Sequence, residues 1–113
     1  MDELAVEKVL RCVELIPSGR VVAYGEIGRT VGLGPRAVGR VMSTHGHLVS
    51  WWRGTNAYGD LPAHLRPEAR ERWAAEGIAF KPNGLGCRIG QHRVDLEWLA
   101  GQWAADTVDL PAE

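Results

Sequence analysis

The sequence has few cysteines and no long apolar run. Two of its 113 residues are cysteine, Cys12 and Cys87, and neither stands in a Cys-x-x-Cys pair or a Cys/His cluster. We therefore expect neither a structural zinc site nor a disulfide framework. No apolar stretch approaches the roughly 20 residues that cross a bilayer. Acidic residues follow Met1 where an export signal would carry basic ones, so we expect a cytoplasmic protein without a membrane partner.

A strong net charge is also absent, because the formal charge is only −1. The charge is nevertheless segregated along the chain: residues 11–42 and 77–94 each carry a local +3, and residues 95–113 carry −5. This pattern allows nucleic-acid binding without requiring it. The length and the 45 % hydrophobic content fit one domain. We assign it to residues 1–104 and treat residues 105–113 as an acidic, frayed tail.

Sets of residues that would indicate catalysis are missing as well. The sequence offers no Ser/His/Asp set, no cluster of metal ligands and no phosphate-binding loop. The Gly-x-Gly at Gly32 and Gly34 lacks the strand and the downstream acid of a dinucleotide site. We therefore expect neither a cofactor nor a metal.

What the sequence does contain is mostly helical periodicity. Helices are predicted over residues 2–15, over residues 66–76 with Pro67 in the first turn, and over residues 95–104 with Asp95 as N-cap. Between the last two, the turn signal in residues 82–86 predicts a small β-hairpin whose arms are residues 78–80 and 87–89. The fold class is therefore mostly α with one small hairpin.

Residues 22–42 predict a helix-turn-helix. Ile27 and Val31 lie four apart in the first helix, and Val38, Val41 and Met42 form the apolar face of the second. Residues 32–35, Gly-Leu-Gly-Pro, suit a tight break between the two helices. Such a motif usually presents its second helix to DNA, and here that helix carries Arg36 and Arg40 four residues apart. An ordinary helical hairpin with solvated arginines is the alternative.

Two adjacent tryptophans follow a polar loop predicted over residues 43–47. Residues 48–56 are short and aromatic, so they indicate a buried strand or an extended loop that enters a pocket. In an extended segment Trp51 and Trp52 point to opposite faces. One can therefore line a cleft while the other packs in the core.

Four ordered motifs together resemble the active-site domain of the O6-alkylguanine-DNA alkyltransferases, and within that superfamily the alkyltransferase-like proteins. They are residues 16–21 (Ile-Pro-Ser-Gly-Arg-Val), residues 24–27 (Tyr-Gly-Glu-Ile), residues 36–39 (Arg-Ala-Val-Gly) and the pair Glu76-Gly77. The resemblance covers residues 4 to about 99. It implies a winged helix-turn-helix-like domain that binds duplex DNA and turns a damaged guanine out of the stack into a pocket.

The resemblance also implies roles for individual residues. Tyr24 would crowd the phosphate beside the flipped nucleotide, and Arg36 would fill the vacated place in the stack through the minor groove. Arg40 would contact a phosphate or the groove, and Met42 would line the edge of the pocket. The structural alternatives are a core aromatic for Tyr24 and a solvated side chain for Arg36.

The chain departs from the transferases at the reactive position. Alkyltransferases carry Pro-Cys-His-Arg, and the aligned residues here are Ser50-Trp51-Trp52-Arg53, so the nucleophile's position is Trp51 and that of its histidine is Trp52. Alkyltransferase-like proteins typically keep the histidine, so Trp52 is a further departure. Without a thiol, Glu76 has no thiolate to generate, and it could simply pair with a backbone amide. The resemblance therefore implies binding without alkyl transfer, and no enzyme.

Trp51 can bind a base instead of reacting with it. An aromatic face can stack on a flipped base or pack on its alkyl group. Arg53 would meet the base or its phosphate, and Trp52 is expected in the core. Plain core packing is the alternative for both tryptophans.

The resulting hypothesis is a non-enzymatic sensor that binds DNA containing O6-alkylguanine as a monomer and marks the lesion for nucleotide excision repair proteins. A rival hypothesis is a domain that kept the fold and lost lesion recognition. It would then serve as a non-specific DNA-binding, regulatory or protein-interaction module.

Overall fold

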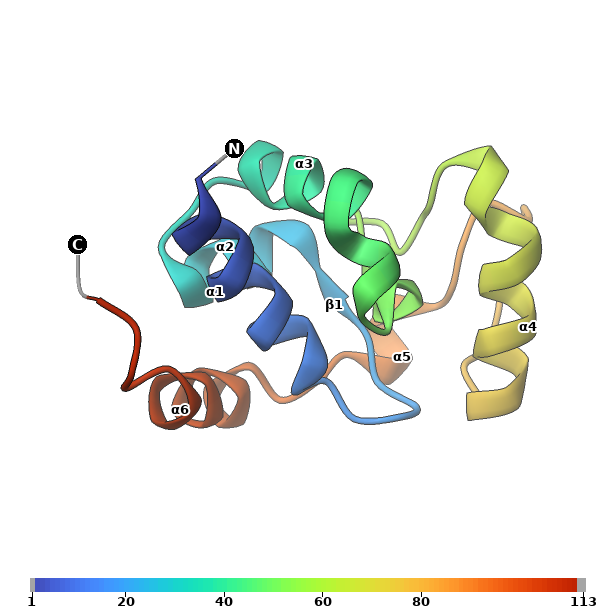
Figure 1. Ribbon diagram of the computed structural model, residues 1–113. Coiled ribbons are helices and arrows are strands. Elements are labelled where there is room, and N and C mark those ends of the chain that lie inside the picture. Colours follow the sequence, from blue (N-terminus) through green and yellow to red (C-terminus); the bar gives the residue numbers. More distant parts are fainter. Residues whose placement is uncertain (1, 112–113) are drawn as a thin grey trace.

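The computed structural model describes residues 2–111, which are mostly helical (Figure 1). The helices are α1 (Glu3–Glu14), α2 (Tyr24–Val31), α3 (Pro35–His45), α4 (Arg66–Glu76), α5 (Ile89–His92) and α6 (Leu96–Asp106). The short strands β1 (Val22–Ala23) and β2 (Gly54–Thr55) and the 3-10 turns η1 (Gly46–Leu48), η2 (Trp51–Arg53) and η3 (Ala63–Leu65) connect them. None of the described helices has the length and apolar character needed to span a membrane.

The first three helices pack together as the sequence pattern predicts. α1 begins after Asp2, whose carboxylate accepts the Leu4 N–H at 3.0 Å, an N-cap that satisfies one of the free amides of the first turn. The apolar faces of α1, α2 and α3 meet in one hydrophobic cluster, which Val94 and Leu99 from the C-terminal part complete. This cluster is the larger of two cores.

The predicted helix-turn-helix is present. α2 ends at Gly32, whose φ of +84° is a left-handed conformation that glycine adopts without strain, and α3 begins at Pro35. The Gly28 carbonyl accepts the amides of both Gly32 and Leu33 at 2.8 Å. The break is so tight that a Cβ on Gly28 would collide with the Leu33 carbonyl. The close approach of these two backbones fixes how α3 leaves α2.

The sheet differs from the predicted one. β1 and β2 pair in parallel, Val22 with Gly54 and Ala23 with Thr55, whereas the predicted hairpin is reduced to the single antiparallel bridge Phe80–Cys87. The start of the second predicted arm also pairs with the loop before η3. The Cys87 amide donates to the Gly59 carbonyl at 2.9 Å, and Asp60 bridges to Gly86. Ile89, expected in a strand, starts α5.

A second hydrophobic cluster lies under α4. α4 runs over the predicted residues and ends at Gly77, and its Trp73 is fully buried in this cluster. The other buried members are Val21, Ala23, Leu61, Ala69, Ile78, Cys87 and Ile89. Figure 1 shows α4 at one end of the molecule and α6 at the other, so the two clusters lie side by side along its length.

The loop predicted over residues 43–47 is helical in its first part. α3 continues to His45, and η1 follows directly. The hydroxyls of Ser43 and Thr44 donate to the Arg40 carbonyl at 3.0 Å and 2.8 Å, so these polar side chains bond within the helix instead of ending it. The prediction failed because serine and threonine were taken as loop formers.

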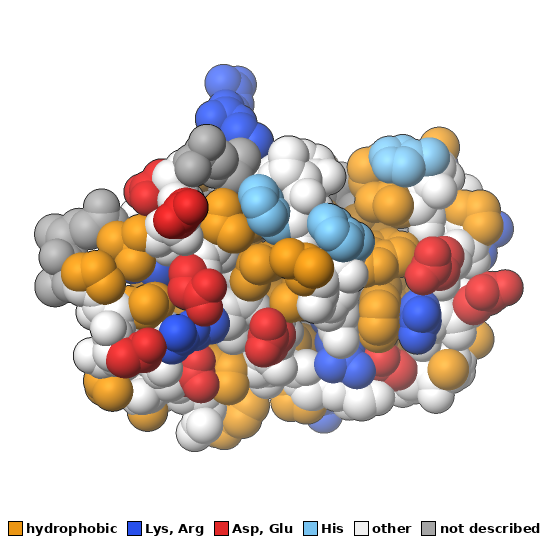
Figure 2. All heavy atoms as spheres, in the orientation of Figure 1, with side chains coloured by type: hydrophobic (Ala, Val, Ile, Leu, Met, Phe, Trp, Pro, Cys, Tyr) orange, Lys and Arg blue, Asp and Glu red, His pale blue; other side chains and the backbone are white. Residues whose placement is uncertain are grey.

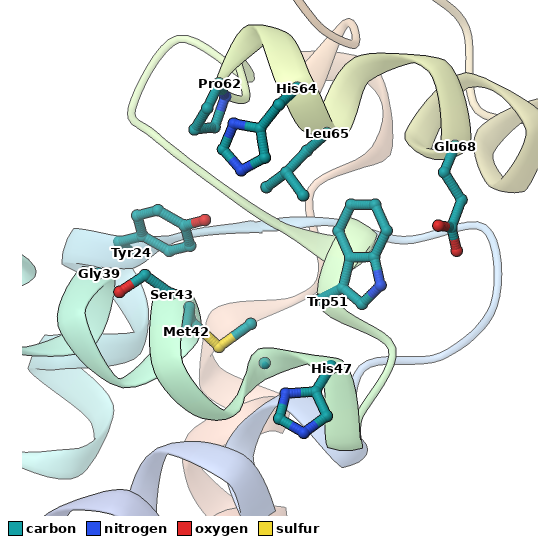
Figure 3. A pocket seen from close by; sticks show the side chains of 11 residues that line it. Tyr24, Gly39, Met42, Ser43, His47, Trp51, Pro62, His64, Leu65 and Glu68 are labelled. Carbon is teal, nitrogen blue, oxygen red and sulfur yellow. The ribbon is translucent and has the colours of Figure 1, made fainter.

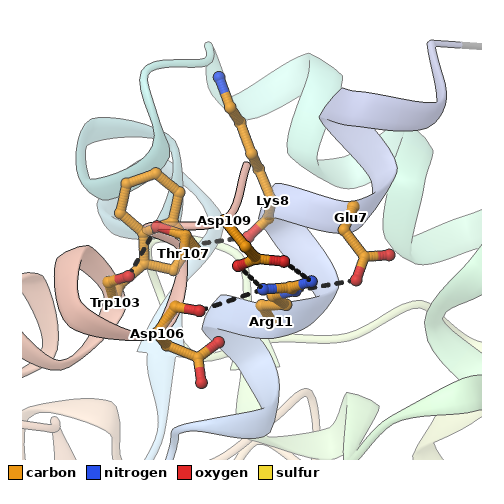
Figure 4. A network of polar contacts seen from close by, with 7 residues as sticks. All are labelled: Glu7, Lys8, Arg11, Trp103, Asp106, Thr107 and Asp109. Carbon is orange, nitrogen blue, oxygen red and sulfur yellow. Dashed lines mark hydrogen bonds and ion pairs between the residues drawn. The ribbon is translucent and has the colours of Figure 1, made fainter. Parts of the chain in front are cut away.

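The C-terminal segment docks on α1, where we expected a frayed tail. α6 begins after Asp95, as predicted, but continues to Asp106, and Trp103 donates its indole N–H to the Lys8 carbonyl at 3.0 Å. Arg11 donates to both carboxylate oxygens of Asp109, at 2.7 Å and 3.0 Å (Figure 4). Residues 112 and 113 of the predicted tail lie outside the described residues.

Candidate functional site

A cavity of about 390 Å³ opens between α3 and the segment that leads into α4 (Figure 3). Two groups of residues line it. The first comes from the helix-turn-helix and the turns after it: Tyr24, Gly39, Met42, Ser43, Gly46, His47 and Trp51. The second comes from η3 and its surroundings: Pro62, His64, Leu65 and Glu68. Of the predicted pocket residues, Tyr24, Met42 and Trp51 are therefore brought together, and Arg53 is not.

One wall of the cavity is a face of α3 and its continuation. Met42, Ser43 and Gly46 follow Gly39 by three, four and seven residues. This spacing places all four on one side of a helix. Only Met42 of these was predicted to line a pocket. The i, i+3, i+4, i+7 spacing of small residues was a signal that could have identified the others.

Tyr24, the first residue of α2, is held between two glycines. A Cβ on Gly54 would lie 3.3 Å from Tyr24 Cε1, and one on Gly39 would lie 4.0 Å from Cδ2, so the ring occupies the space that larger residues would fill. Because Gly54 pairs with Val22 in the sheet, the register of β1 and β2 places Tyr24 at the cavity. Burial raises the pKa of the Tyr24 phenol, so the hydroxyl stays neutral at physiological pH.

Trp51 lies where the two hydrophobic clusters meet and packs against both. It belongs to the 3-10 turn η2, so the extended conformation predicted for this segment is wrong at Trp51 and right at Gly54 and Thr55. The Trp51 and Trp52 rings meet edge to face, with centroids 5.7 Å apart and an interplanar angle of 85°. Trp51 lines the cavity, whereas Trp52, which was expected in the core, is only partly buried against the second cluster.

Arg53 is occupied away from the cavity, contrary to the prediction that it binds the base or its phosphate. Its Nη2 lies 2.7 Å from Glu76 Oε2, and its Nη1 donates to the Ile16 carbonyl at 2.9 Å. The Arg53 and Glu76 side chains are only 16 % and 10 % exposed. A buried cation needs such a partner, and this need decides where Arg53 points.

Glu76 collects three different donors. Besides the Arg53 donors, it accepts the Gly19 amide at 2.9 Å and the Trp52 indole N–H at 2.8 Å. The bond from Gly19 is the pairing with a backbone amide that the sequence suggested for Glu76. Burial acts to raise the pKa of Glu76, but the hydrogen bonds from Arg53, Gly19 and Trp52 outweigh it and hold the pKa below its ordinary value. The carboxylate is therefore ionised and fully used within the fold.

Neither cysteine can act as a nucleophile in the cavity. Cys12 and Cys87 are buried in different clusters, and neither lines the cavity. Burial raises the pKa of Cys12 to about 12 and that of Cys87 to about 11, so both thiols stay protonated at neutral pH. Over residues 2–111 the structure also groups no set of side chains that could hold a metal ion.

The far wall of the cavity could not be predicted from the sequence, because it depends on the tertiary fold. Pro62, His64, Leu65 and Glu68 belong to a segment with no apolar periodicity of its own. In Figure 2 histidine side chains lie on the upper face on both sides of a hollow lined by apolar side chains. His47 contributes from one side of the cavity and His64 from the other.

The solvent face of α3 carries the predicted arginines. Arg36 and Arg40 are exposed, and within residues 2–111 neither guanidinium has a hydrogen-bond or ion-pair partner. They lie at i and i+4, and Ser43 of the cavity wall follows Arg36 by seven residues, so this face borders the cavity. A mostly apolar cavity with an aromatic wall thus lies beside two exposed arginines.

A comparison with protein-family models finds a match over most of the helical part of the chain. The model of a protein family described as "6-O-methylguanine DNA methyltransferase, DNA binding domain" matches residues 5–78 of this chain. The matched range runs from the first turn of α1 to just past α4, and it contains the cavity and the exposed face of α3.

Two individual proteins are similar to this chain. A DNA base-flipping protein of Thermus thermophilus is 57 % identical over 30 residues, which span 26 % of this chain and a fifth of that protein. The crystal structure of Atl1 from S. pombe, in complex with damaged DNA containing O6-carboxymethylguanine, superposes with a TM-score of 0.70. That match has 26 % sequence identity and covers 84 % of this chain and 98 % of the other.

Proposed function

The chain belongs to the 6-O-methylguanine DNA methyltransferase family by its DNA-binding domain, and from this premise we propose that it recognises O6-alkylguanine in duplex DNA without repairing it. The observation that carries the proposal is the cavity. It has an indole wall, Trp51, and no thiol among its lining residues. Its volume of about 390 Å³ lies in the range of small-ligand pockets.

A base inside a duplex can enter such a cavity only after it leaves the stack. In this proposal Tyr24, which lies at the cavity and begins α2, presses on the phosphate beside the flipped nucleotide. Arg36, exposed at the start of α3, occupies the vacated stack position, and Arg40 one turn later binds a phosphate. The two similar proteins, a DNA base-flipping protein and Atl1 in complex with damaged DNA, support this proposal.

Alkyl transfer has no reactive group to proceed through. We assign Trp51 to the position of the transferases' nucleophile and Trp52 to that of its histidine. An indole carbon or N–H at neutral pH is not a nucleophile comparable with a thiolate. Trp52 instead donates to Glu76, as a ring N–H of the histidine could, so the substitution keeps a donor for the carboxylate and removes a base. The protein is in this proposal a sensor and not an enzyme.

A titration of labelled duplexes tests the proposal. The duplexes are identical except for one O6-methylguanine in place of guanine, and binding is measured at fixed, near-physiological salt. We expect tighter binding to the lesion duplex and no added alkyl mass on the protein by mass spectrometry. Equal binding to both duplexes, or a methylated protein, would contradict the proposal.

The cellular location and the repair partners also belong to the proposal. We propose that the protein acts in the cytoplasm, and that the held lesion marks the site for nucleotide excision repair proteins. Pull-down of purified excision repair proteins on lesion DNA, with and without this protein, tests the second statement. A lesion complex that does not change their recruitment would contradict it.

A further inference from the structure

The cavity carries one carboxylate. Glu68 projects from the first turn of α4 and lines the cavity together with Trp51 and Leu65. With histidine counted as neutral, Glu68 is the one formally charged side chain among the eleven lining residues. Figure 3 shows Trp51 on the side of Glu68 and Tyr24 on the opposite side of the cavity.

The charge of Glu68 is only partly compensated. Arg72 Nη2 lies 3.6 Å from Glu68 Oε2, but both side chains are more than half exposed, and such surface pairs are weak. The Arg72 guanidinium is also drawn over the Trp52 ring, 4.6 Å from its centroid, and Arg72 is not among the lining residues. None of the eleven side chains that line the cavity carries a formal positive charge, with histidine again counted as neutral. A ligand in the cavity therefore meets a net negative wall.

The chemistry of guanine decides which part of the lesion meets this wall. O6 lies on the edge of the base remote from N9, which bonds to the sugar. In the proposed function the sugar-phosphate backbone stays near Tyr24 and the arginines of α3. The O6 substituent is then directed away from Tyr24, toward Trp51 and Glu68.

We propose that Glu68 makes the pocket selective for uncharged O6 substituents and disfavours anionic ones such as carboxymethyl, an inference that rests on the proposed function. An anionic substituent would bring two negative charges together in a cavity that holds less water than the bulk. A neutral substituent that carries an N–H or O–H can instead donate to the Glu68 carboxylate. The chain would then differ in preference from the S. pombe relative, whose complex contains O6-carboxymethylguanine.

The test uses two lesions of matched size and different charge. O6-carboxymethylguanine ends in a carboxylate, and O6-carbamoylmethylguanine ends in an uncharged amide of nearly the same size. A difference in affinity between the two duplexes therefore reports the effect of charge and not that of size. At about pH 8 and moderate salt, we expect the protein to bind the carbamoylmethyl duplex roughly threefold to tenfold more tightly, the size of one partly screened charge pair. Glu68→Gln should bring this ratio close to one.

Glu71→Gln is the matched control. Glu71 lies on the same helix, is exposed and does not line the cavity, so its loss changes the net charge equally but should leave the ratio unchanged. Equal binding of the two lesion duplexes by the unsubstituted protein, or a ratio that Glu68→Gln does not move, would overturn the selectivity proposal. Absence of any preference for O6-methylguanine over guanine would instead overturn the proposed function.

Discussion

At the scale of single residues, Trp51 is the side chain on which the proposed lesion recognition depends most. Its ring forms a wall of the cavity and touches both hydrophobic clusters, so the cavity lies at the junction between two separately packed parts of the chain. A base that stacks on an aromatic side chain gains roughly 1–3 kcal/mol. This contact is available to a flipped base and not to one that remains in the duplex.

We therefore expect Trp51→Ala to lower the preference for the O6-methylguanine duplex over the guanine duplex by about tenfold. The ratio of the two affinities, measured by fluorescence anisotropy, is the right quantity, because partial unfolding would weaken both affinities equally. Trp98→Ala is the control, since Trp98 lies on α6 and is already 41 % exposed. An unchanged ratio in Trp51→Ala would show that the indole does not hold the lesion.

The ionisation of Glu76 should make the free energy of unfolding depend on pH. Its pKa in the folded protein is below the ordinary value near 4.5, so folding favours the ionised form. The stabilisation is complete above that value and is lost as the pH falls through the folded-state pKa. Stability should therefore drop at acidic pH, in part because Arg53 loses its charged partner.

Glu76→Gln should lower the free energy of unfolding at pH 7 by roughly 3 kcal/mol, since it leaves a buried arginine without a counter-charge. The difference from the unsubstituted protein should shrink below about pH 4. Urea denaturation at several pH values measures both effects, with Glu71→Gln as an exposed control on the same helix. A constant difference across the pH range would contradict this account of Glu76.

At the scale of elements, the turn of the helix-turn-helix depends on Gly28. Helix propensity alone favours Ala over Gly inside α2, by up to about 1 kcal/mol. The Leu33 carbonyl, however, occupies the place of a Cβ at Gly28, so an added Cβ and the carbonyl oxygen cannot both keep these positions. The steric term should outweigh the propensity, because relief requires α3 to move relative to α2.

Gly28→Ala is accordingly expected to lower the free energy of unfolding by roughly 1–3 kcal/mol. Gly25→Ala in the same helix is the matched control. A Cβ there would meet only the flexible end of Arg29 at 4.0 Å, so stability should be unchanged or slightly higher. Thermal unfolding followed by circular dichroism distinguishes the two variants, and a Gly28→Ala protein as stable as Gly25→Ala would contradict the steric argument.

At the scale of the whole molecule, charge distribution matters more than net charge. The molecule measures 42 × 27 × 20 Å and carries a formal charge of −1, yet α3 exposes Arg36 and Arg40 without partners among the described residues. Acidic residues gather instead in the C-terminal segment, where Asp109 pairs with Arg11. DNA can therefore approach the α3 face without meeting the acidic segment.

The two arginines should give different signatures in DNA binding. Arg40→Ala, which removes a phosphate contact, should weaken lesion and control duplexes alike and reduce the slope of log K against log salt by about one. Arg36→Ala should mainly reduce the preference for the lesion, because its proposed place is the gap left by the flipped base. Salt titrations on both duplexes measure these effects. A loss of lesion preference in Arg40→Ala equal to that in Arg36→Ala would contradict the separation of roles.

The sequence by itself determined the local elements and the type of site. Local signals mark the starts of α1, α4 and α6. The side chains of Asp2 and Asp95 accept free amides of the first turns of α1 and α6, and the ring of Pro67 fixes a helical φ in the first turn of α4. The glycine and proline between α2 and α3 likewise specify the turn locally. The proposal that Trp51 stands in place of the transferases' thiol also comes from the sequence alone, through the resemblance, and it favours binding over reaction.

Only the tertiary structure decided which residues surround the cavity. Tyr24 and Trp51 line the same cavity because β1 pairs in parallel with β2, a contact between segments about 30 residues apart that no local pattern encodes. Arg53 was predicted in the pocket, and the burial of its guanidinium beside Glu76 placed it elsewhere, because a buried charge must find a counter-charge. Glu68 and His64 reach the cavity through the packing of α4 on the second cluster, a long-range contact for which the sequence carries no periodic signal.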